Sequence, residues 1–237
     1  MTKTTTQRSP NKPTGRGPLG EFPTAAAFLP ESRSLMRLRE AAAECRGCPL
    51  YRDATQTVFG EGARDAELML VGETPGDQED LAGHPFVGPA GRLLDEALAA
   101  VGVERKDVYV TNAVKHFKWE PRGKRRLHKK PSAREAAACR PWFLAELEAV
   151  EPRTIVCLGA TAAQALLGRD FCLTRDHGKP IAGPSTSGGR LAPWIVATWH
   201  PSAVLRAPTP ADRSKLKRTL IADLRAAVKT LARRKPK

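Results

Sequence analysis

The stretch "AELMLVGETPGDQEDLAGHPFVGPAG", residues 66–91, contains the structural unit that the rest of the chain repeats. Its first eight residues form a short apolar run that predicts a buried strand. A loop rich in glycine, proline and acidic residues follows, and an amphipathic helix with leucines on one face comes next. A buried strand that leads through a loop into a helix is the unit from which α/β folds are built.

The same succession recurs along the chain. The predicted strands cover residues 66–73, 107–114 and 153–159, with a fourth that begins at residue 193. Strands that alternate with helices predict an α/β fold, a three-layer sandwich with a central, mainly parallel four-stranded sheet. Because ligands bind at the carboxyl ends of such strands, the loops at 73–91, 111–128 and 199–206 are expected to converge on one site.

Two of the predicted helices carry clear signals. The helix of residues 132–152 has Ser132 as a plausible N-cap with Glu135 three residues later, and its Pro141 requires a kink or a break. The last helix, near 211–233, repeats apolar residues on one face. A first helix is predicted from Pro30 onward.

Composition places the chain among ordinary globular proteins with an unusual charge. Hydrophobic residues make up 41% and charged residues 27% of its 237 residues, but the formal net charge is +14. Such a surplus favours a polyanionic partner, and without a basic amphipathic helix we expect nucleic acid rather than a membrane. Residues 1–28 are predicted to be a disordered basic tail, 29–233 a single domain, and 234–237 a basic C-terminal tail.

The loop after the first strand crowds four acids into eight residues: Glu73, Asp77, Glu79 and Asp80. It is neither a Walker A loop nor a dinucleotide fingerprint. Taken alone, the acids are compatible with a metal site, an acid–base site or a solvated turn, and a turn is the most common of the three.

Three further residues have both a structural and a functional interpretation. His200 follows an apolar strand, where a histidine is usually a structural residue. Its place at the carboxyl end of a strand, in the expected cleft, makes a functional role as good an interpretation as a structural one. Asn112 has the same placement, and its amide could pair with a donor and an acceptor of a base edge. Phe86 is more often a core residue than a stacking surface.

The five cysteines do not suggest a disulfide framework, because their number is odd and no secretion signal precedes them. Cys45 and Cys48 form a C-x-x-C, and Cys139 and Cys157 follow far along the chain. Four thiolates suit zinc or an iron–sulfur cluster, and buried thiols without metal are the alternative. Cys172 is expected to be a plain thiol.

These motifs together resemble the uracil-DNA glycosylase superfamily over most of residues 35–230. "GETPGDQEDLAGHPFVGPAG" and "HPSAVLR" resemble its two active-site motifs, and the spaced cysteines resemble its iron–sulfur branch, family 4. More narrowly, "GDQED" together with "GKRRLH" resembles UdgX, the branch that becomes covalently attached to DNA after removing uracil. Thr74 stands where that branch usually has glutamine, and Leu127 where it usually has isoleucine.

The resemblance assigns expected roles to named residues. The catalytic group is expected to comprise His128, Glu73, His200 and Asp77. Substrate binding is expected from Phe86, which stacks on uracil, from Asn112, which reads its edge, and from Gly72, Gln78 and Ser202. The DNA phosphates are expected to bind Lys124, Arg125 and Arg126. A structural 4Fe-4S cluster is expected on Cys45, Cys48, Cys139 and Cys157.

His128 lies in the basic run "RGKRRLHKKP", where one more lysine would attract DNA better. An imidazole with a pKa of about 6.5 is mostly neutral at pH 7 and keeps a lone pair, whereas a lysine does not. The resemblance therefore implies a glycosylase that excises uracil and then bonds His128 to C1′ of the abasic site, once per molecule.

Two alternatives remain at this point. One is a multiple-turnover glycosylase of the family 4 type that uses water as its nucleophile. The other is a DNA-binding iron–sulfur protein without enzymatic activity. We expect a cytoplasmic monomer without a membrane partner that acts on uracil-containing DNA, with single strands preferred because no base pair needs to be broken.

Overall fold

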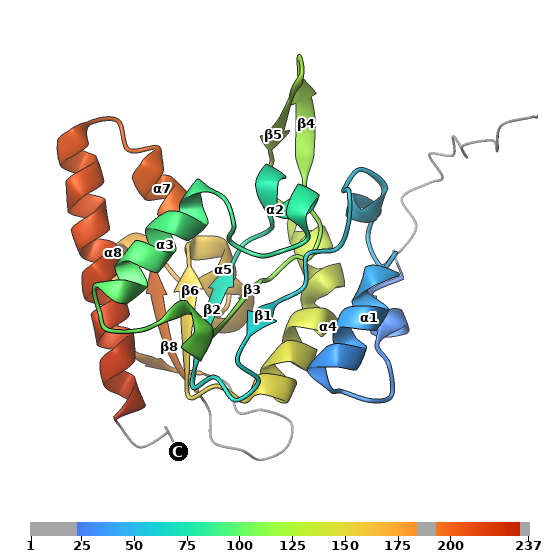
Figure 1. The fold of residues 1–237 in the computed structure, drawn as a ribbon, viewed down its shortest axis with the longest axis horizontal. Helices are drawn as coiled ribbons and strands as arrows, with labels where there is room; N and C mark the ends of the chain where they lie inside the picture. Colours follow the sequence, from blue (N-terminus) through green and yellow to red (C-terminus); the bar gives the residue numbers. More distant parts are fainter. Residues whose placement is uncertain (1–22, 184–192, 233–237) are drawn as a thin grey trace, which may run out of the picture.

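A central sheet of parallel strands organises the molecule (Figure 1). The computed structural model describes residues 23–183 and 193–232. The parallel strands are β2 (Leu68–Gly72), β3 (Val108–Asn112), β6 (Thr154–Leu158) and β8 (Trp194–Thr198), in the order β3, β2, β6, β8. Every residue of the first three strands is buried, which explains their continuous apolar runs. The predicted α/β fold with a mainly parallel sheet is confirmed.

Two short strands extend this sheet at its edges. β1 (Glu61–Gly62) pairs antiparallel with β3, and β7 (Ile181–Ala182) pairs antiparallel with β8. The sheet in the described part of the chain therefore has six strands, and the predicted number of four was wrong. A strand of two residues is too short to show a periodic pattern, so neither edge strand could be predicted from the sequence.

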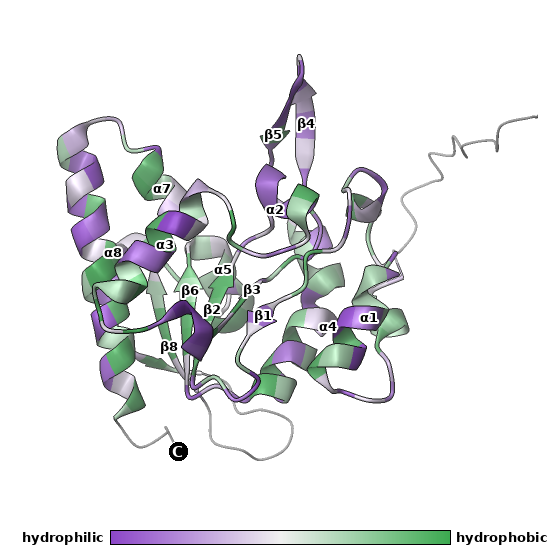
Figure 2. Cartoon of the chain, in the orientation of Figure 1, coloured by the Kyte–Doolittle hydropathy of each residue, from purple (hydrophilic) through white to green (hydrophobic). Residues whose placement is uncertain are grey.

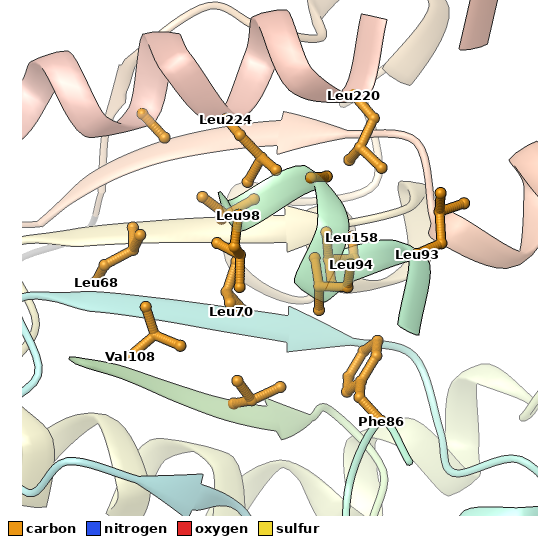
Figure 3. Packing of buried hydrophobic residues seen from close by; sticks show 14 of the residues in the cluster. Leu68, Leu70, Phe86, Leu93, Leu94, Leu98, Val108, Leu158, Leu220 and Leu224 are labelled. Carbon is orange, nitrogen blue, oxygen red and sulfur yellow. The ribbon is translucent and has the colours of Figure 1, made fainter. Parts of the chain in front are cut away.

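Helices cover both faces of the sheet and form the predicted three layers. Along β2, Leu68 and Leu70 face one layer while Met69 and Val71 face the other, because side chains alternate along a strand. The first layer contains α3 (Pro89–Ala99), α7 (Pro201–Leu205) and α8 (Pro210–Leu231), and the leucines of α3 and α8 pack as shown in Figure 3. The second contains α4 (Ala133–Val150), α5 (Ala160–Leu167) and α6 (Leu173–Asp176).

The long helices agree with their sequence signals. Ser132 caps α4: its hydroxyl accepts the Glu135 N–H at 3.2 Å, and the Glu135 carboxylate accepts the Ser132 N–H at 2.6 Å. Pro141 lies inside α4, which continues as one helix rather than splitting. The longest described helix, α8, spans 22 residues, and no helix in the described ranges is both long and apolar enough to cross a membrane.

The first helical segment begins at Ala25, earlier than the helix predicted from Pro30 onward. η1 (Ala25–Phe28) is a short 3-10 helix with Ala25 buried, so residues 25–28 are not part of a disordered tail. α1 (Leu35–Ala43) packs against α4, and η2 (Pro49–Arg52) follows. The rest of the predicted basic tail, residues 1–22, and the C-terminal tail both lie outside the described residues.

The basic run forms a hairpin rather than the predicted loop. β4 (Trp119–Arg122) and β5 (Arg125–His128) pair antiparallel, with Trp119 opposite His128 at the base. Gly123 adopts a φ of 58° at the turn, a conformation that glycine allows without steric cost. The hairpin projects from the body beside α2 (Asp77–Ala82) and is largely hydrophilic (Figures 1 and 2).

A fully buried ion pair joins the sheet to α4. Lys115, just after β3, contacts the carboxylate of Glu146, and neither side chain is exposed. The same carboxylate accepts hydrogen bonds from Thr111 at 2.9 Å and from the N–H of Gly60 at 2.9 Å. This network fixes α4 against the end of β3, close to where the hairpin begins.

We predict that Glu146→Gln destabilises the protein by roughly 3–5 kcal/mol, because it leaves the buried Lys115 charge without its counter-charge. Chemical denaturation measures the effect. Glu148→Gln is the matched control, since Glu148 is exposed on the same helix and should change stability by less than about 0.5 kcal/mol. Equal stability of the two variants would contradict the prediction.

Candidate active site

A pocket of about 280 Å³ opens at the carboxyl end of the parallel sheet. The ends of the four parallel strands each contribute to its lining: Glu73 follows β2, Asn112 ends β3, Gly159 follows β6 and His200 follows β8. The three loops that the sequence predicted to converge therefore do so, and the β6 loop adds a fourth wall that was not predicted.

Asn112 and Phe86 lie together over Gly72. A Cβ added at Gly72 would be 2.2 Å from Asn112 Oδ1 and 2.7 Å from Phe86 Cζ, so only glycine leaves room for both side chains. Phe86 belongs to the apolar core and also lines the pocket. Its φ of 56° is unusual for a bulky residue and costs roughly 1–3 kcal/mol. The Asn112 side-chain amide has no hydrogen-bond partner among the described residues and is free to bind a ligand.

His200 is held in one orientation by the start of α7. Its Nδ1 accepts the backbone N–H of Ser202 at 3.1 Å, so the proton of the neutral ring is on Nε2. Burial lowers the pKa of His200 to about 4, with Arg206 and His128 adding to the effect. The ring therefore stays neutral near pH 7 and can offer its Nε2–H as a hydrogen-bond donor. Its centroid lies 5.8 Å from that of Phe86.

His128 is the last residue of β5 and lines the same pocket. The side chain remains accessible, yet partial burial lowers its pKa, and the Arg206 charge lowers it further while Glu73 opposes the shift. The ring lies 6.0 Å from that of Phe117, centroid to centroid. The pocket thus contains two neutral imidazoles with a carboxylate and a guanidinium nearby.

Thr74 and Glu79 shape the wall that follows β2. The Thr74 hydroxyl donates to the backbone oxygen of His116 at 2.8 Å, so its proton is used within the protein. Glu79 accepts the N–H groups of Gly76 at 3.1 Å and Gly88 at 2.8 Å, which ties the two ends of the loop together. Both residues line the pocket, although neither was predicted as a site residue.

The other two site residues predicted from this loop, Gln78 and Asp77, lie outside the pocket. Gln78 is exposed on α2 and does not line the pocket. Asp77 also lies outside the lining, and its carboxylate binds Arg126 at 2.6 Å. Of the interpretations left open for these acids, the metal site receives no support, because no group of three or more metal-binding side chains suited to an ion occurs in the described residues.

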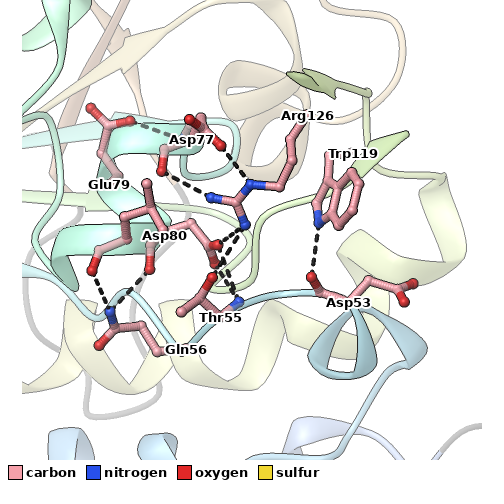
Figure 4. A network of polar contacts seen from close by, with 10 residues as sticks. Asp53, Thr55, Gln56, Asp77, Glu79, Asp80, Trp119 and Arg126 are labelled. Carbon is pink, nitrogen blue, oxygen red and sulfur yellow. Dashed lines mark hydrogen bonds and ion pairs between the residues drawn. The ribbon is translucent and has the colours of Figure 1, made fainter. Parts of the chain in front are cut away.

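The three predicted phosphate-binding residues differ in their exposure and in their ion-pair partners. Lys124 and Arg125 are exposed at the hairpin's outer end. Arg126 is instead engaged by Asp77 and Asp80 (Figure 4), and its role as a phosphate ligand stays a prediction. Arg206, at the end of α7, is an exposed cation that lines the pocket, and it was not named as a site residue although it is the last residue of the "HPSAVLR" motif.

The four cysteines do not form one group. Cys45, Cys48 and Cys139 lie in the apolar cluster between α1 and α4. Cys157 lies in the core layer beneath α4 and α5, and burial alone raises its pKa to about 12. The predicted four-cysteine ligand set therefore does not fit, because Cys157 occupies a different part of the core from the other three thiols.

Comparison with known proteins finds a matching family model and several relatives of this chain. A family model described as "Uracil DNA glycosylase superfamily" matches residues 59–225. A type-4 uracil-DNA glycosylase of Thermotoga maritima is 39% identical over 190 residues, covering 79% of this chain and 90% of the relative. One from Archaeoglobus fulgidus is 40% identical over 168 residues, covering 69% and 79%. A type-5 enzyme of Pyrobaculum aerophilum is 32% identical over 176 residues, covering 65% and 71%.

We predict that His200 remains uncharged at about pH 5.5, where an imidazole with the ordinary pKa of about 6.5 is mostly protonated. Nitrogen-detected NMR of the ring, assigned with His200→Gln, measures its protonation. The unfolded chain takes up this proton near pH 6.5 and the folded chain only near pH 4, so this residue's contribution to stability is lost as pH falls between these values. A ring that titrates near pH 6.5 in the folded protein would contradict the assignment.

Proposed function

This chain belongs to the uracil-DNA glycosylase superfamily, and we propose that it excises uracil from DNA and then bonds His128 to C1′ of the abasic site. The observation that carries the second part of the proposal is the presence of His128 in the pocket beside Asn112, Phe86 and His200. The first part is supported by the family and by the names of relatives with up to 40% identity.

Recognition of the base begins with extrusion of the nucleotide into the pocket. Phe86 offers an aromatic surface for the uracil ring, held in place by the core around it. The free amide of Asn112 can donate to a carbonyl oxygen and accept from the ring N–H of uracil, a pairing that the amino group of cytosine would not match. This edge contact supplies selectivity that phosphate contacts cannot give.

Cleavage of the glycosidic bond leaves both bonding electrons on uracil N1 and makes the sugar oxocarbenium-like. The neutral His200 ring donates its Nε2–H to the departing uracil anion and stabilises the charge that develops there. The Glu73 carboxylate, in the same pocket, stabilises the positive charge on the sugar. Neither residue has to change its protonation state for this step.

Attack by His128 completes the proposed reaction. A lone pair of the neutral imidazole forms the bond to C1′ as the bond to uracil N1 breaks. The ring then carries one proton too many, and Glu73 is the nearby carboxylate that can accept it. The product is a neutral azole bonded to C1′, which is a poor leaving group, so the protein stays attached.

A second candidate is a multiple-turnover enzyme in which water attacks C1′. The comparisons favour it, because the relatives at 39% and 40% identity are named type-4 uracil-DNA glycosylases. Both candidates share Asn112, Phe86, His200 and Glu73. They differ only in what His128 does.

We predict that wild-type protein forms an adduct with uracil-containing DNA that survives boiling in detergent, at no more than one adduct per protein molecule. A shifted band on a denaturing gel measures it. His128→Ser removes the nucleophile and opens room for water, so it should form no adduct and release abasic product beyond its own concentration.

The same gel separates the two candidates. Wild-type protein mixed with excess substrate should stop when product equals protein if His128 attacks. Abasic product that rises far above the protein concentration, without a shifted band, supports water as the nucleophile and overturns the covalent proposal while leaving uracil excision intact. Single-stranded and duplex substrates run side by side also test the expected preference for single strands.

An iron–sulfur cluster remains a separate proposal, and no step above depends on it. The thiols of Cys45, Cys48 and Cys139 lie in one part of the core and are the candidates for such a cluster, although the described residues contain no ready-made group of three metal ligands. We predict that Cys139→Ala abolishes any bound iron and acid-labile sulfide, whereas Cys157→Ala leaves both unchanged. Loss of iron in Cys157→Ala would restore the four-cysteine set.

A further inference from the structure

Phe86 has a strained backbone, although its ring is the aromatic surface of the pocket. Its φ of 56° lies in the left-handed region, which a bulky residue adopts only where its surroundings enforce it. The ring is 6% exposed, belongs to the same apolar cluster as Leu93 and Leu94, and lies at the carboxyl end of β2 (Figure 3). Because this conformation is unfavourable by itself, neighbouring groups have to hold the backbone of residue 86 in place.

The peptide groups on both sides of Phe86 are packed against other segments. The carbonyl oxygen of Pro85, in the peptide that precedes Phe86, accepts a hydrogen bond at 2.9 Å from a terminal nitrogen of Arg105. On the other side, a Cβ added at Gly91 would be 1.7 Å from the Phe86 carbonyl oxygen, so the first turn of α3 lies directly against that carbonyl. These two contacts restrain the backbone of Phe86 from opposite ends.

Arg105 is itself oriented by a carboxylate on α3. It belongs to η3 (Arg105–Asp107), the short 3-10 helix between α3 and β3, and its other terminal nitrogen donates to Asp95 Oδ1 at 2.9 Å. A guanidinium presents its N–H groups in a rigid, forked arrangement, so one arginine can bind the Asp95 carboxylate and the Pro85 carbonyl at the same time. We call these two side chains the Asp95–Arg105 pair.

The exposure of the Asp95–Arg105 pair indicates that it acts on local geometry more than on stability. Its side chains are 46% and 33% exposed, and ion pairs that solvent screens to this extent contribute little to the free energy of folding. The loop also has a second attachment, because His84 bonds the Glu61 carboxylate at 2.5 Å. Loss of the Arg105 side chain should therefore leave the fold intact and release the peptide that leads into Phe86.

The position of the Phe86 ring matters because two polar groups of the pocket lie close to it. Asn112 Oδ1 and Phe86 Cζ both lie over Gly72. The Phe86 and His200 rings are 5.8 Å apart, centroid to centroid, with an angle of 27° between their planes. A uracil ring stacked on Phe86 can therefore meet the amide and the imidazole together, whereas a displaced Phe86 would present it to both at the wrong depth.

We propose that Arg105, oriented by Asp95, is a positioning residue for the Phe86 ring. It thereby sets how the uracil ring is aligned with Asn112 and His200 while the glycosidic bond breaks. Neither member of the Asp95–Arg105 pair lines the pocket, so the effect passes through the backbone of Phe86. The inference rests on the proposed excision of uracil, and it holds whichever nucleophile then captures the sugar.

Single-turnover excision of uracil, with protein in excess over DNA, tests the proposal. The rate is measured over a range of protein concentrations, which gives a maximal rate and a half-saturating concentration. Arg105→Gln should lower the maximal rate by about 10-fold, because misplacement of a reacting group by about 1 Å costs up to about 100-fold. The half-saturating concentration should change little, since phosphate contacts supply most of the affinity for DNA.

Two graded variants and a matched control accompany Arg105→Gln. Arg105→Lys keeps a cation that can bind Pro85 or Asp95 but not both, so its maximal rate should be intermediate. Asp95→Asn removes the charge that orients Arg105 and should also give an intermediate rate. Lys106→Gln removes a positive charge from the same 3-10 helix, where Lys106 is 73% exposed and pairs with Glu104, and should leave both parameters unchanged.

A double variant shows whether Arg105 acts through Phe86. Phe86→Leu removes the aromatic surface and should slow excision by itself. In that background, Arg105→Gln should cause less than about a 2-fold further loss, because residues that act through one contact are not additive. Two independent losses that multiply would show that Arg105 acts by another route, and they would overturn the proposal.

The other outcomes are separable. If the wild-type protein excises no uracil, the proposed function fails. If it excises uracil and Arg105→Gln matches Lys106→Gln, only the positioning role fails. If Arg105→Gln raises the half-saturating concentration and weakens its salt dependence at an unchanged maximal rate, Arg105 is a phosphate contact and the inference is overturned. Asp95→Asn decides the question should Arg105→Gln fail to fold, because Asp95 is nearly half exposed.

Discussion

The pocket depends on the register between two parallel strands. Gly72 at the end of β2 lies beside Asn112 at the end of β3. Because side chains alternate along a strand, a shift of one residue would point the Asn112 amide away from the pocket. The missing side chain at Gly72 then leaves space for both the amide and the Phe86 ring. The backbone ladder of the sheet therefore fixes the distance between a flat aromatic surface and a polar group before any ligand arrives.

The distribution of charge around the pocket depends on which charged side chains have partners within the protein. The chain carries a formal charge of +14, yet the residues beside the pocket include a cluster of acids. Those acids are used within the protein: Glu79 binds two backbone N–H groups, and Asp80 binds one N–H and Arg126. In the hairpin, Lys124 and Arg125 lie at exposed positions, where phosphate groups can reach them.

The strands, the layers and the convergence of the loops could be predicted from the sequence. Apolar runs indicate the buried strands, and the alternation of strands with helices along the chain indicates a layered parallel sheet whose loops meet at one edge. It could not reveal that Arg126 binds Asp77 and Asp80, since a run of like charges looks the same whether its members face solvent or a buried carboxylate. The hairpin was missed for a similar reason: β5 is charged on both faces and shows no alternation. The separation of Cys157 from the other three thiols could have been anticipated, because the residue lies inside the fully buried strand β6, where a buried side chain is the ordinary outcome.

A reaction that consumes the protein's own side chain requires stricter geometry than one that uses water. A water molecule can adjust its position to the sugar, and a base needs only to lie within reach of it. An imidazole fixed to a strand cannot adjust, so its position must be set by the structure around it. It must also remain neutral among cations, and the same partial burial that lowers the pKa of His128 keeps its lone pair available. The hydrogen bonds at the hairpin base thus hold the imidazole of His128 in place, and the electrostatics of the pocket keep it unprotonated.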